Sequence, residues 1–345
     1  MPAPVDKRHA KRGALIAIES SYGSGSPSVS TSTDGFHTIE DFDLAPAWQH
    51  DGTREGNSSG GFAELKAVEP SGRKFETELQ HNFRGPGASG YATSSVEPSV
   101  HRFLRLLGFS ATYDGVSSPK KWTYAPISDS YPSGVFKGFQ GGESMLGSGV
   151  LAKSLEITAA GLVVPIWKFG ILGIAALPVD ESVPAITYAH SAQPTPKATA
   201  AVLSLTQGGQ TFAGRLQEFS LSIERETVER TDQTAAGGAH AGFDLGAFTG
   251  TLNCVVESTP LPSSSPYQSS TQMDPYKLYD IGQLFALAHQ VGAATGSRWK
   301  VNSSNVQLAE APKRSKNGSI ARWDLALRFK PADDGSMVDL AIVCD

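Results

Sequence analysis

Charged residues are scarce in this chain: Asp, Glu, Lys and Arg make up only 18% of its 345 residues. The formal net charge is −5, and no long run of Lys or Arg follows the first dozen residues. A protein that grips nucleic acid through phosphate contacts needs clustered basic residues. Binding of that kind is therefore not expected.

Cysteines and long apolar runs are equally sparse. Cys254 and Cys344 lie far apart without a CxxC spacing, which excludes a recognisable disulfide framework or zinc knuckle and predicts a buried, inert Cys254. The most apolar stretch, 162–177, is broken by Pro, Lys and Gly and is shorter than the roughly 20 residues that cross a bilayer, so it predicts one or two strands. Near the N-terminus, Glu19 ends the apolar run 14–18 too early for a secretory signal.

Motifs for catalysis or cofactor binding are also missing. Residues 85–90 match G-x-G-x-x-G, but Pro86 occupies the second position and no helix follows at once, which predicts a turn or loop. The eight histidines show no H-x-H or H-x-x-x-H spacing, although distant ligands could still converge in space. There is no G-x-S-x-G, and the carboxylate pairs at 40–41 and 333–334 sit beside turn residues. We therefore expect no catalytic, cofactor-binding or metal-binding residues, and no enzyme.

Glycine and proline, by contrast, are abundant, with 36 and 21 residues. This composition is typical of short strands joined by many turns, or of a protein whose surface is largely covered by copies of itself. The chain also repeats itself: E-D-F-D-L around Phe42 and Q-E-F-S-L around Phe219 are 177 residues apart, as are Pro98 and Pro275. A glycine-rich polar loop follows each motif, at 47–61 and at 229–246.

Each half of the repeat offers one helix and one Trp-bearing strand. Start and stop signals predict helices at 95–108 and 275–291, the first with a stripe of Val100, Phe103, Leu104 and Leu107, the second with Leu278, Ile281, Phe285 and Ala288. Strands are expected at 161–173, with Trp167, and at 320–330, with Trp323.

The sequence thus predicts a mainly β protein of two tandem modules, each an antiparallel β-sandwich or partial barrel flanked by one helix. The expected boundaries are an N-terminal arm at 1–12, a first module at 13–178, a linker at 179–197 and a second module at 198–345. The charged run 224–232 has two interpretations: an exposed hairpin ladder with cross-strand ion pairs, or a strand that lines a channel or docks a neighbouring subunit.

Several blocks resemble the major tail tube proteins of siphophages. They are A-L-I-A-I-E-S-S-Y-G at 14–23, F-L-R-L-L-G at 103–108, W-T-Y-A-P-I-S at 122–128, L-Q-E-F-S-L-S-I-E-R-E-T-V-E-R at 216–230, N-S-S-N-V-Q-L-A-E-A-P at 302–312 and G-S-I-A-R-W-D-L-A-L-R-F at 318–329. The resemblance implies a structural virion protein whose duplicated tube modules form trimeric, pseudo-hexameric rings. These rings stack into a hollow tube through which genomic DNA passes without specific binding.

The same resemblance implies the partners: further copies of the chain, a tape measure protein, a tail terminator and tail tip proteins, with no membrane. The protein would lie in the virion tail, and in the host cytoplasm during assembly. Alternation along the charged run predicts that Glu224 and Glu226 face the lumen, that Arg225 points into the wall towards a carboxylate, and that the lumen is net negative with more acidic residues from the second half. Residues expected to contact the next ring are His50, Asp51, Arg54, Glu55, Arg230, Asp232 and His240.

A different virion or secreted β-sandwich, such as an adhesin or a carbohydrate-binding module, has a similar composition and remains the alternative. An enzyme with residues gathered from distant loops is the third possibility. Electron microscopy separates the three, because only the first predicts hollow tubes of uniform diameter.

Overall fold

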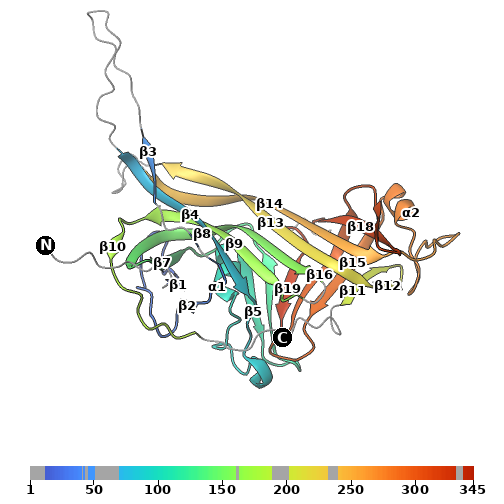
Figure 1. The fold of residues 1–345 in the computed structure, drawn as a ribbon, viewed down its shortest axis with the longest axis horizontal. Helices are drawn as coiled ribbons and strands as arrows, with labels where there is room; N and C mark the ends of the chain where they lie inside the picture. The colour runs from blue at the N-terminus through green and yellow to red at the C-terminus, as the bar shows by residue number, and fades with distance from the viewer. Residues whose placement is uncertain are drawn as a thin grey trace, which may run out of the picture.

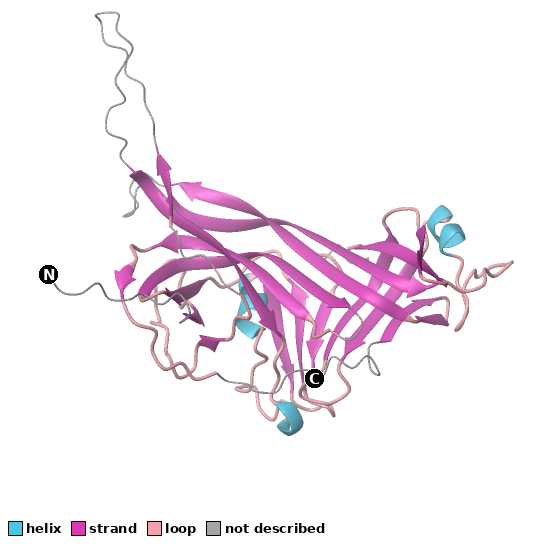
Figure 2. Ribbon diagram, in the orientation of Figure 1, coloured by secondary structure: helices cyan, strands magenta, loops and turns pink. Residues whose placement is uncertain are grey.

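The computed structural model describes residues 12–40, 42, 46–50, 70–160, 163–188, 202–231, 240–331 and 337–345. Within these ranges the chain is mainly β, with antiparallel strands and two short α-helices (Figures 1 and 2). The first half, 12–188, contains β1 (Arg12–Ile18), β2 (Gly35–Phe36), β3 (Ala47–His50), β4 (Pro70–Asn82), α1 (His101–Leu106), β5 (Phe109–Asp114), β6 (Lys121–Pro126), β7 (Gly134–Gln140), β8 (Glu143–Ala160), β9 (Ile166–Ala175) and β10 (Val179–Asp180). The second half, 202–345, contains β11 (Val202–Gln207), β12 (Gln210–Gly214), β13 (Leu216–Thr231), β14 (His240–Glu257), α2 (Pro275–Asp280), β15 (Leu284–Val291), β16 (Trp299–Leu308), β17 (Lys313–Asn317), β18 (Ile320–Phe329) and β19 (Ala341–Cys344).

Eight strands form one continuous antiparallel sheet, which we call the main sheet. Its order is β3–β4–β9–β8–β13–β14–β18–β17, so four strands of the first half are followed by four of the second. The long strands β4, β8, β9, β13 and β14 run side by side across the molecule in Figure 1. The two halves are therefore joined by backbone hydrogen bonds between β8 and β13.

A second sheet, joined to the main sheet where the end of β16 pairs with β18, also crosses the boundary between the halves. Its order is β12–β11–β15–β16–β19–β6–β5, and β19 pairs with β16 on one side and with β6 of the first half on the other. At the other end of the molecule, β7, β1 and β2 continue from the early part of β8.

One hydrophobic core lies beneath these sheets and draws on both halves. Alternating strand residues such as Phe169, Leu221 and Leu325 are buried in it, and α1 adds Phe103 and Leu104. Fully burying a side chain of this size stabilises the fold by about 1.5–3 kcal/mol. Trp167 and Trp299, one from each half, meet edge to face with ring centroids 5.3 Å apart. The halves thus share a core in addition to a sheet.

The glycine-rich segment 85–90 is a loop with a short 3-10 turn at Gly87–Ser89, as its proline predicted. The amide of Gly87 donates to the carbonyl of Gly296 at 3.0 Å, so this loop packs on the second half. A Cβ on Gly85 would lie only 1.9 Å from the Gly296 oxygen. The glycine is therefore needed for the close approach of two backbones, and not for a nucleotide.

The first helix keeps its predicted stripe but is shorter than expected. Val100, Phe103, Leu104 and Leu107 are all buried, and Gly108, with φ +82°, follows the last turn. Helical residues span only His101–Leu106, because the Pro98 ring and the turn at 99–100 hold the preceding segment out of the helix.

The prediction of a helix over 275–291 is wrong beyond Asp280. Asp274 caps α2 by accepting from the amides of Tyr276 and Lys277, as expected, but Gly282, with φ +63°, ends the turn. Residues 284–291 then form β15, in which every second side chain from Phe285 to Val291 is buried. Ile281 is 53% exposed, so the supposed helical stripe does not exist.

The predicted linker and N-terminal arm are described only in part. Residues 179–188 lie against the first half, where Glu181 pairs with Lys137 at 2.8 Å and the Tyr188 ring stacks on His37. Residues 189–197 and 1–11 lie outside the described ranges, and Arg12 begins β1.

Candidate functional site

The main sheet has two unpaired ends, and these are the first candidate for function. Among the described residues β3 pairs only with β4, and β17 pairs only with β18. The side chains of β17 are mostly exposed, and three of them are basic: Lys313, Arg314 and Lys316. A strand edge with free N–H and C=O groups is a template for pairing with another chain.

Between these ends, the β8–β13 joint shows how one half of the chain pairs with the other. Ser154 lies opposite Glu224 and Ala160 opposite Glu218, so seven residues of each strand are in register. Before Ser154, bulges bend β8 away, and its early part pairs with β7 instead. Beyond the joint, β13 and β14 extend as a two-stranded arm, residues 225–231 and 240–249, without β8 as a neighbour.

The arm lies over the first half and is fixed there by several contacts. Phe243 and Leu245 pack on Leu151 of β8 and Leu172 of β9 in a small buried cluster. Glu229 pairs with Lys74 of β4 at 3.1 Å. The amide of Phe243 donates to the Tyr22 hydroxyl at 2.5 Å, and that of Leu245 to the Tyr131 hydroxyl at 2.8 Å.

Arg225 anchors the base of the arm. Its side chain is buried, donates to the carbonyl of Ile127 at 3.2 Å, and lies over the rings of Tyr131 and Phe248. Desolvation lowers the pKa of the guanidinium, while Tyr131 and Asp244 raise it. We had expected a carboxylate partner; the hydrogen bond goes instead to a backbone carbonyl, with aromatic faces supplying further stabilisation.

The face of the main sheet turned away from the core, which we call the outward face, is polar. Glu78 pairs with Lys168 at 2.8 Å, Glu218 with Arg322 at 3.8 Å, and Glu76 with Lys153. The hydrogen bond to Glu78 raises the pKa of Lys168. Solvent-exposed pairs of this kind are worth about 0–1 kcal/mol each, so they add little stability and balance charge along the face.

Glu224 and Glu226, the predicted lumen residues, are both exposed, whereas Arg225 between them is buried. Glu224 lies on the outward face opposite Ser154 and Thr249, and a bulge follows between Arg225 and Thr227. Among the described residues neither glutamate forms an ion pair. The first half also places Glu76, Glu78 and Glu156 on the outward face, so both halves contribute acidic residues to it.

The residues predicted to contact a second ring are only partly described. Asp51, Arg54, Glu55 and Asp232 lie outside the described ranges, and His50 and His240 are described as strand backbone only. Arg230 is exposed at the end of the arm, with its guanidinium 6.0 Å from the Tyr22 ring centroid.

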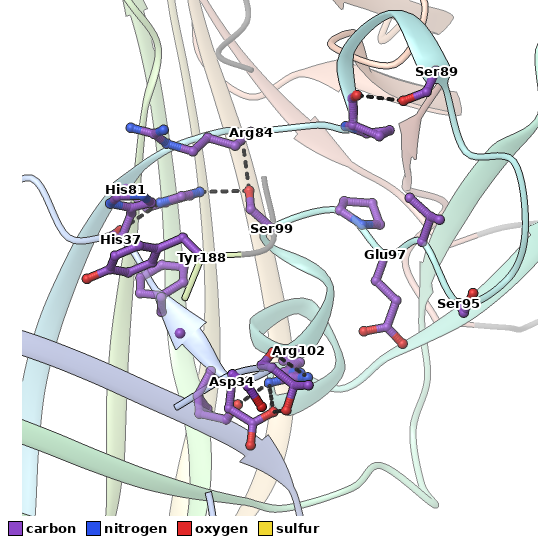
Figure 3. A pocket seen from close by; sticks show the side chains of 18 residues that line it. Asp34, His37, His81, Arg84, Ser89, Ser95, Glu97, Ser99, Arg102 and Tyr188 are labelled. Carbon is purple, nitrogen blue, oxygen red and sulfur yellow. Dashed lines mark hydrogen bonds and ion pairs between the residues drawn. The ribbon is translucent and has the colours of Figure 1, made fainter. Parts of the chain in front are cut away.

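A polar pocket of about 710 Å³ in the first half is the second candidate (Figure 3). Asp34, His37, His81, Glu97, Ser99 and Arg102 line it, and Tyr188 stacks on His37 at its rim. Within the pocket Arg102 pairs with Asp34 at 2.7 Å. No local pattern in the sequence indicates this pocket, because its residues come from segments far apart in the chain.

A Ser–His pair in this pocket has the spacing of a nucleophile and its base. His81 Nε2 lies 2.7 Å from the Ser99 hydroxyl, and Nδ1 lies 2.8 Å from the His37 carbonyl, which can only accept. Nδ1 therefore carries the proton and Nε2 accepts from Ser99. Burial lowers the pKa of His81 to about 3, which makes it a very weak base. The Ser99 hydroxyl also accepts from the Arg84 amide, so the pair is best understood as a clamp between β4 and the turn before α1.

Neither cysteine has the environment of a reactive thiol. Both are buried, and desolvation raises the pKa of Cys254 to about 12, as expected for an inert core residue. Within the described part of the chain there is no group of three or more His, Cys, Asp or Glu side chains arranged for a metal ion. No helix in that part is long and apolar enough to cross a membrane.

No protein-family model matches this chain, and no curated protein sequence matches it either.

Proposed function

We propose that this chain is the subunit of a self-assembling hollow tube, the tail tube of a long-tailed bacteriophage, and that it is not an enzyme. The observation that carries the proposal is the main sheet, which joins the two halves internally at β8–β13 yet, among the described residues, leaves β3 and β17 unpaired on their outer sides. A ring of copies would pair β17 of one with β3 of the next and remove both edges.

The strand order supports a duplicated module. The group β3–β4–β9–β8 has the same order of hairpins, and the same helix after its second strand, as β13–β14–β18–β17. The registers also agree: Phe75 lies opposite Gly173 in β4–β9, and Leu252 lies opposite Leu327 in β14–β18. In this alignment β17 corresponds to the late part of β8, and β3 to β13.

The internal joint therefore gives a register for the joint between copies. Ser154 of β8 corresponds to Lys313 of β17, because each lies opposite its equivalent on the next strand, Gly170 and Asp324. Ala47 of β3 corresponds to Ser222 of β13, because each lies opposite its equivalent on the next strand, Lys74 and Thr251. Ser222 faces Glu156 inside the chain, and Glu156 corresponds to Ser315, so we expect Ser315 of one copy to face Ala47 of its neighbour.

Charge supports the same arrangement. β17 carries Lys313, Arg314 and Lys316, and the sequence just before β3 carries Glu40, Asp41 and Asp43. Opposite charges steer two such edges together, whereas two β17 edges repel each other. Three copies would supply six four-stranded groups, and the polar outward face with Glu224 and Glu226 would line the bore. A bore with few unpaired basic groups would let DNA pass without phosphate contacts.

The wider assignment rests on the resemblance. It places the protein in the virion tail, made in the host cytoplasm, with tape measure, terminator and tail tip proteins as partners.

Electron microscopy with a cross-linking pair tests the proposal. The unaltered protein, concentrated, should form hollow tubes of uniform diameter. The double variant Ala47→Cys/Ser315→Cys should form disulfides between copies only after assembly, because the predicted register places these residues opposite each other.

The matched control is Ala47→Cys/Arg314→Cys, in which the second cysteine points to the other side of β17 and should cross-link far less. Equal cross-linking of both variants, or none in either, would refute the register. Protein that stays dispersed at all concentrations would refute the tube.

The pocket supports one alternative function, that of an adhesin or carbohydrate-binding module. Its observation is the stacked pair Tyr188 and His37 at the rim of a polar cavity, since aromatic faces beside polar groups suit a sugar ring. Binding of oligosaccharides that is lost in Tyr188→Ala, without tubes, would favour this alternative.

A further inference from the structure

The arm of the second half covers a particular place on the first half. Phe243 and Leu245 lie on Leu151 and Leu172, and the latter are outward-facing residues of β8 and β9. Leu172 is only 4% exposed although its strand partner, Glu76, is solvent-accessible on the same face. Without the arm, these two leucines would be exposed to water.

The corresponding place on the second half is an open hollow of about 500 Å³. In the alignment of the two strand groups, Leu172 of β9 corresponds to Ala326 of β18. Leu172 lies opposite Glu76 of β4, and Ala326 lies opposite the equivalent residue of β14, Asn253. The hollow runs over the end of β8, the start of β13, β14 and β18, and reaches the segment before β17; its lining includes Thr158, Ser220, Asn253, Glu310, Lys313 and Ala326.

The difference lies in what covers the two places. In the first half the covering hairpin, β13–β14, belongs to the same chain and enters from the neighbouring strand group. In the second half the neighbouring strand group would be that of the next copy, whose counterpart hairpin is β3–β4. This hairpin lies at the far end of the main sheet from the hollow of its own chain, so it cannot cover that hollow itself.

We infer that the hollow is the docking surface for the β3–β4 hairpin of a second copy of this chain. The inference rests on the proposed function and adds to it a lateral contact beyond the strand joint. Small side chains support it: where the first half has Leu172 under the arm, the second half has Ala326, which leaves room for a bulkier apolar side chain. The sequence between β3 and β4 supplies such side chains in Phe62, Leu65 and Val68.

The polar rim of the hollow gives the contact its direction. Lys313 and Asp324 lie at one side, next to the β17 edge that the proposed joint uses. A hairpin that continued from a β3 strand paired with β17 would therefore pass directly over the hollow, as the β13–β14 arm passes over Leu172 after its pairing with β8. The same chain geometry thus produces both contacts.

Photo-cross-linking locates the occupant without assuming its residues. A photoreactive benzoylphenylalanine at position 326 should, in assembled protein, cross-link to a peptide from within 47–82 of another copy. The same group at Thr112, an exposed residue of β5, serves as the control and should give no product with that peptide. Cross-links from position 326 that map elsewhere in tubes would overturn the inference.

Filling the hollow gives a second readout. Ala326→Trp should raise the protein concentration needed for polymerisation by about tenfold or more, while Ala321→Trp, on the same strand but outside the hollow, should change it little. Melting curves of the unassembled variants check that both fold. Tubes from Ala326→Trp at the normal concentration would contradict this inference and leave the proposed function standing; no tubes from the unaltered protein would contradict both.

Discussion

The late part of β8 and the strand β17 occupy equivalent places in the two halves, yet they differ in what lies beside them. β8 is paired with β13 along seven residues, and β17 has no strand on its outer side among the described residues. β8 bears Ser154, Glu156 and Thr158 there, whereas β17 bears Lys313, Arg314 and Lys316. The β17 edge, which in the proposed assembly pairs only with another copy, carries charges that discourage indiscriminate pairing. The β8 edge, which is paired within the chain, needs no such charges.

Proline substitutions should separate the two edges most clearly. Ser222 of β13 is paired on both sides, with Thr251 and with Glu156, so Ser222→Pro must break a ladder bond inside the sheet. We expect it to destabilise the fold by about 3 kcal/mol or more. Lys316→Pro, on β17, should cost about 1 kcal/mol or less because the amide of Lys316 points away from β18 towards the open edge, yet it should abolish assembly.

Chemical denaturation measures the first effect and electron microscopy the second. If Lys316→Pro assembled normally, β17 would not be the joint between copies. If both variants lost the same stability, the difference between the edges would be unfounded.

Two arginines of β13 extend the comparison to the arm. Arg225 is buried against Ile127, Tyr131 and Phe248, so Arg225→Ala should destabilise the fold by about 2–3 kcal/mol through lost packing and a lost charged hydrogen bond. Arg230 is exposed over Tyr22, and Arg230→Ala should cost about 0.5 kcal/mol. The urea midpoints of the two variants measure this difference in stability. Equal losses of stability would mean that the arm is not anchored at its base.

Acid should open the first half before the second. Burial lowers the pKa of His81 to about 3 and that of His101 to about 4, from an ordinary value of 6.5. Between pH 6.5 and these values the unfolded chain binds more protons than the folded one, so the free energy of unfolding falls as the pH drops through that window. The slope is at most about 1.4 kcal/mol per pH unit for each histidine.

Hydrogen exchange at pH 7 and pH 5 measures this effect. The amides of β4 and α1, which carry the two histidines, should lose protection before those of β14 and β18. The variant His81→Gln/His101→Gln should weaken the pH dependence. Protection that falls equally in both halves of the unaltered protein would argue against the assignment.

Local chemistry explains why some elements could be predicted from the sequence. Asp274 followed by Pro275 caps a helix wherever it occurs, Gly108 ends one, and strands around Trp167 and Trp323 alternate visibly. The helix prediction failed at residues 284–291 because their apolar residues fit a helical period and a strand period about equally well. Pairing of β15 with β11 and β16, which no local pattern reveals, decides for the strand.

The candidate site was harder to foresee, because it is made of strand neighbours. The alternation of Glu224, Arg225 and Glu226 between exposed and buried follows from the strand period. The β8–β13 joint, the anchoring of Arg225 on a carbonyl and the hollow beside β18 depend on segments brought together only in the folded chain. The basic run at 313–316 was missed in the sequence analysis, and its meaning depends on its place at a sheet edge.

The pairing of β6 with β19 has a consequence for synthesis. β6 spans Lys121–Pro126 and β19 spans Ala341–Cys344, so the second sheet cannot close until β19 has left the ribosome. During translation, β6 of the first half therefore has an unpaired edge until β19 is made. Contacts between segments so distant in sequence also form slowly. A prematurely terminated chain that lacked β19 would keep that edge exposed, and would be a source of aggregates in the cell that made it.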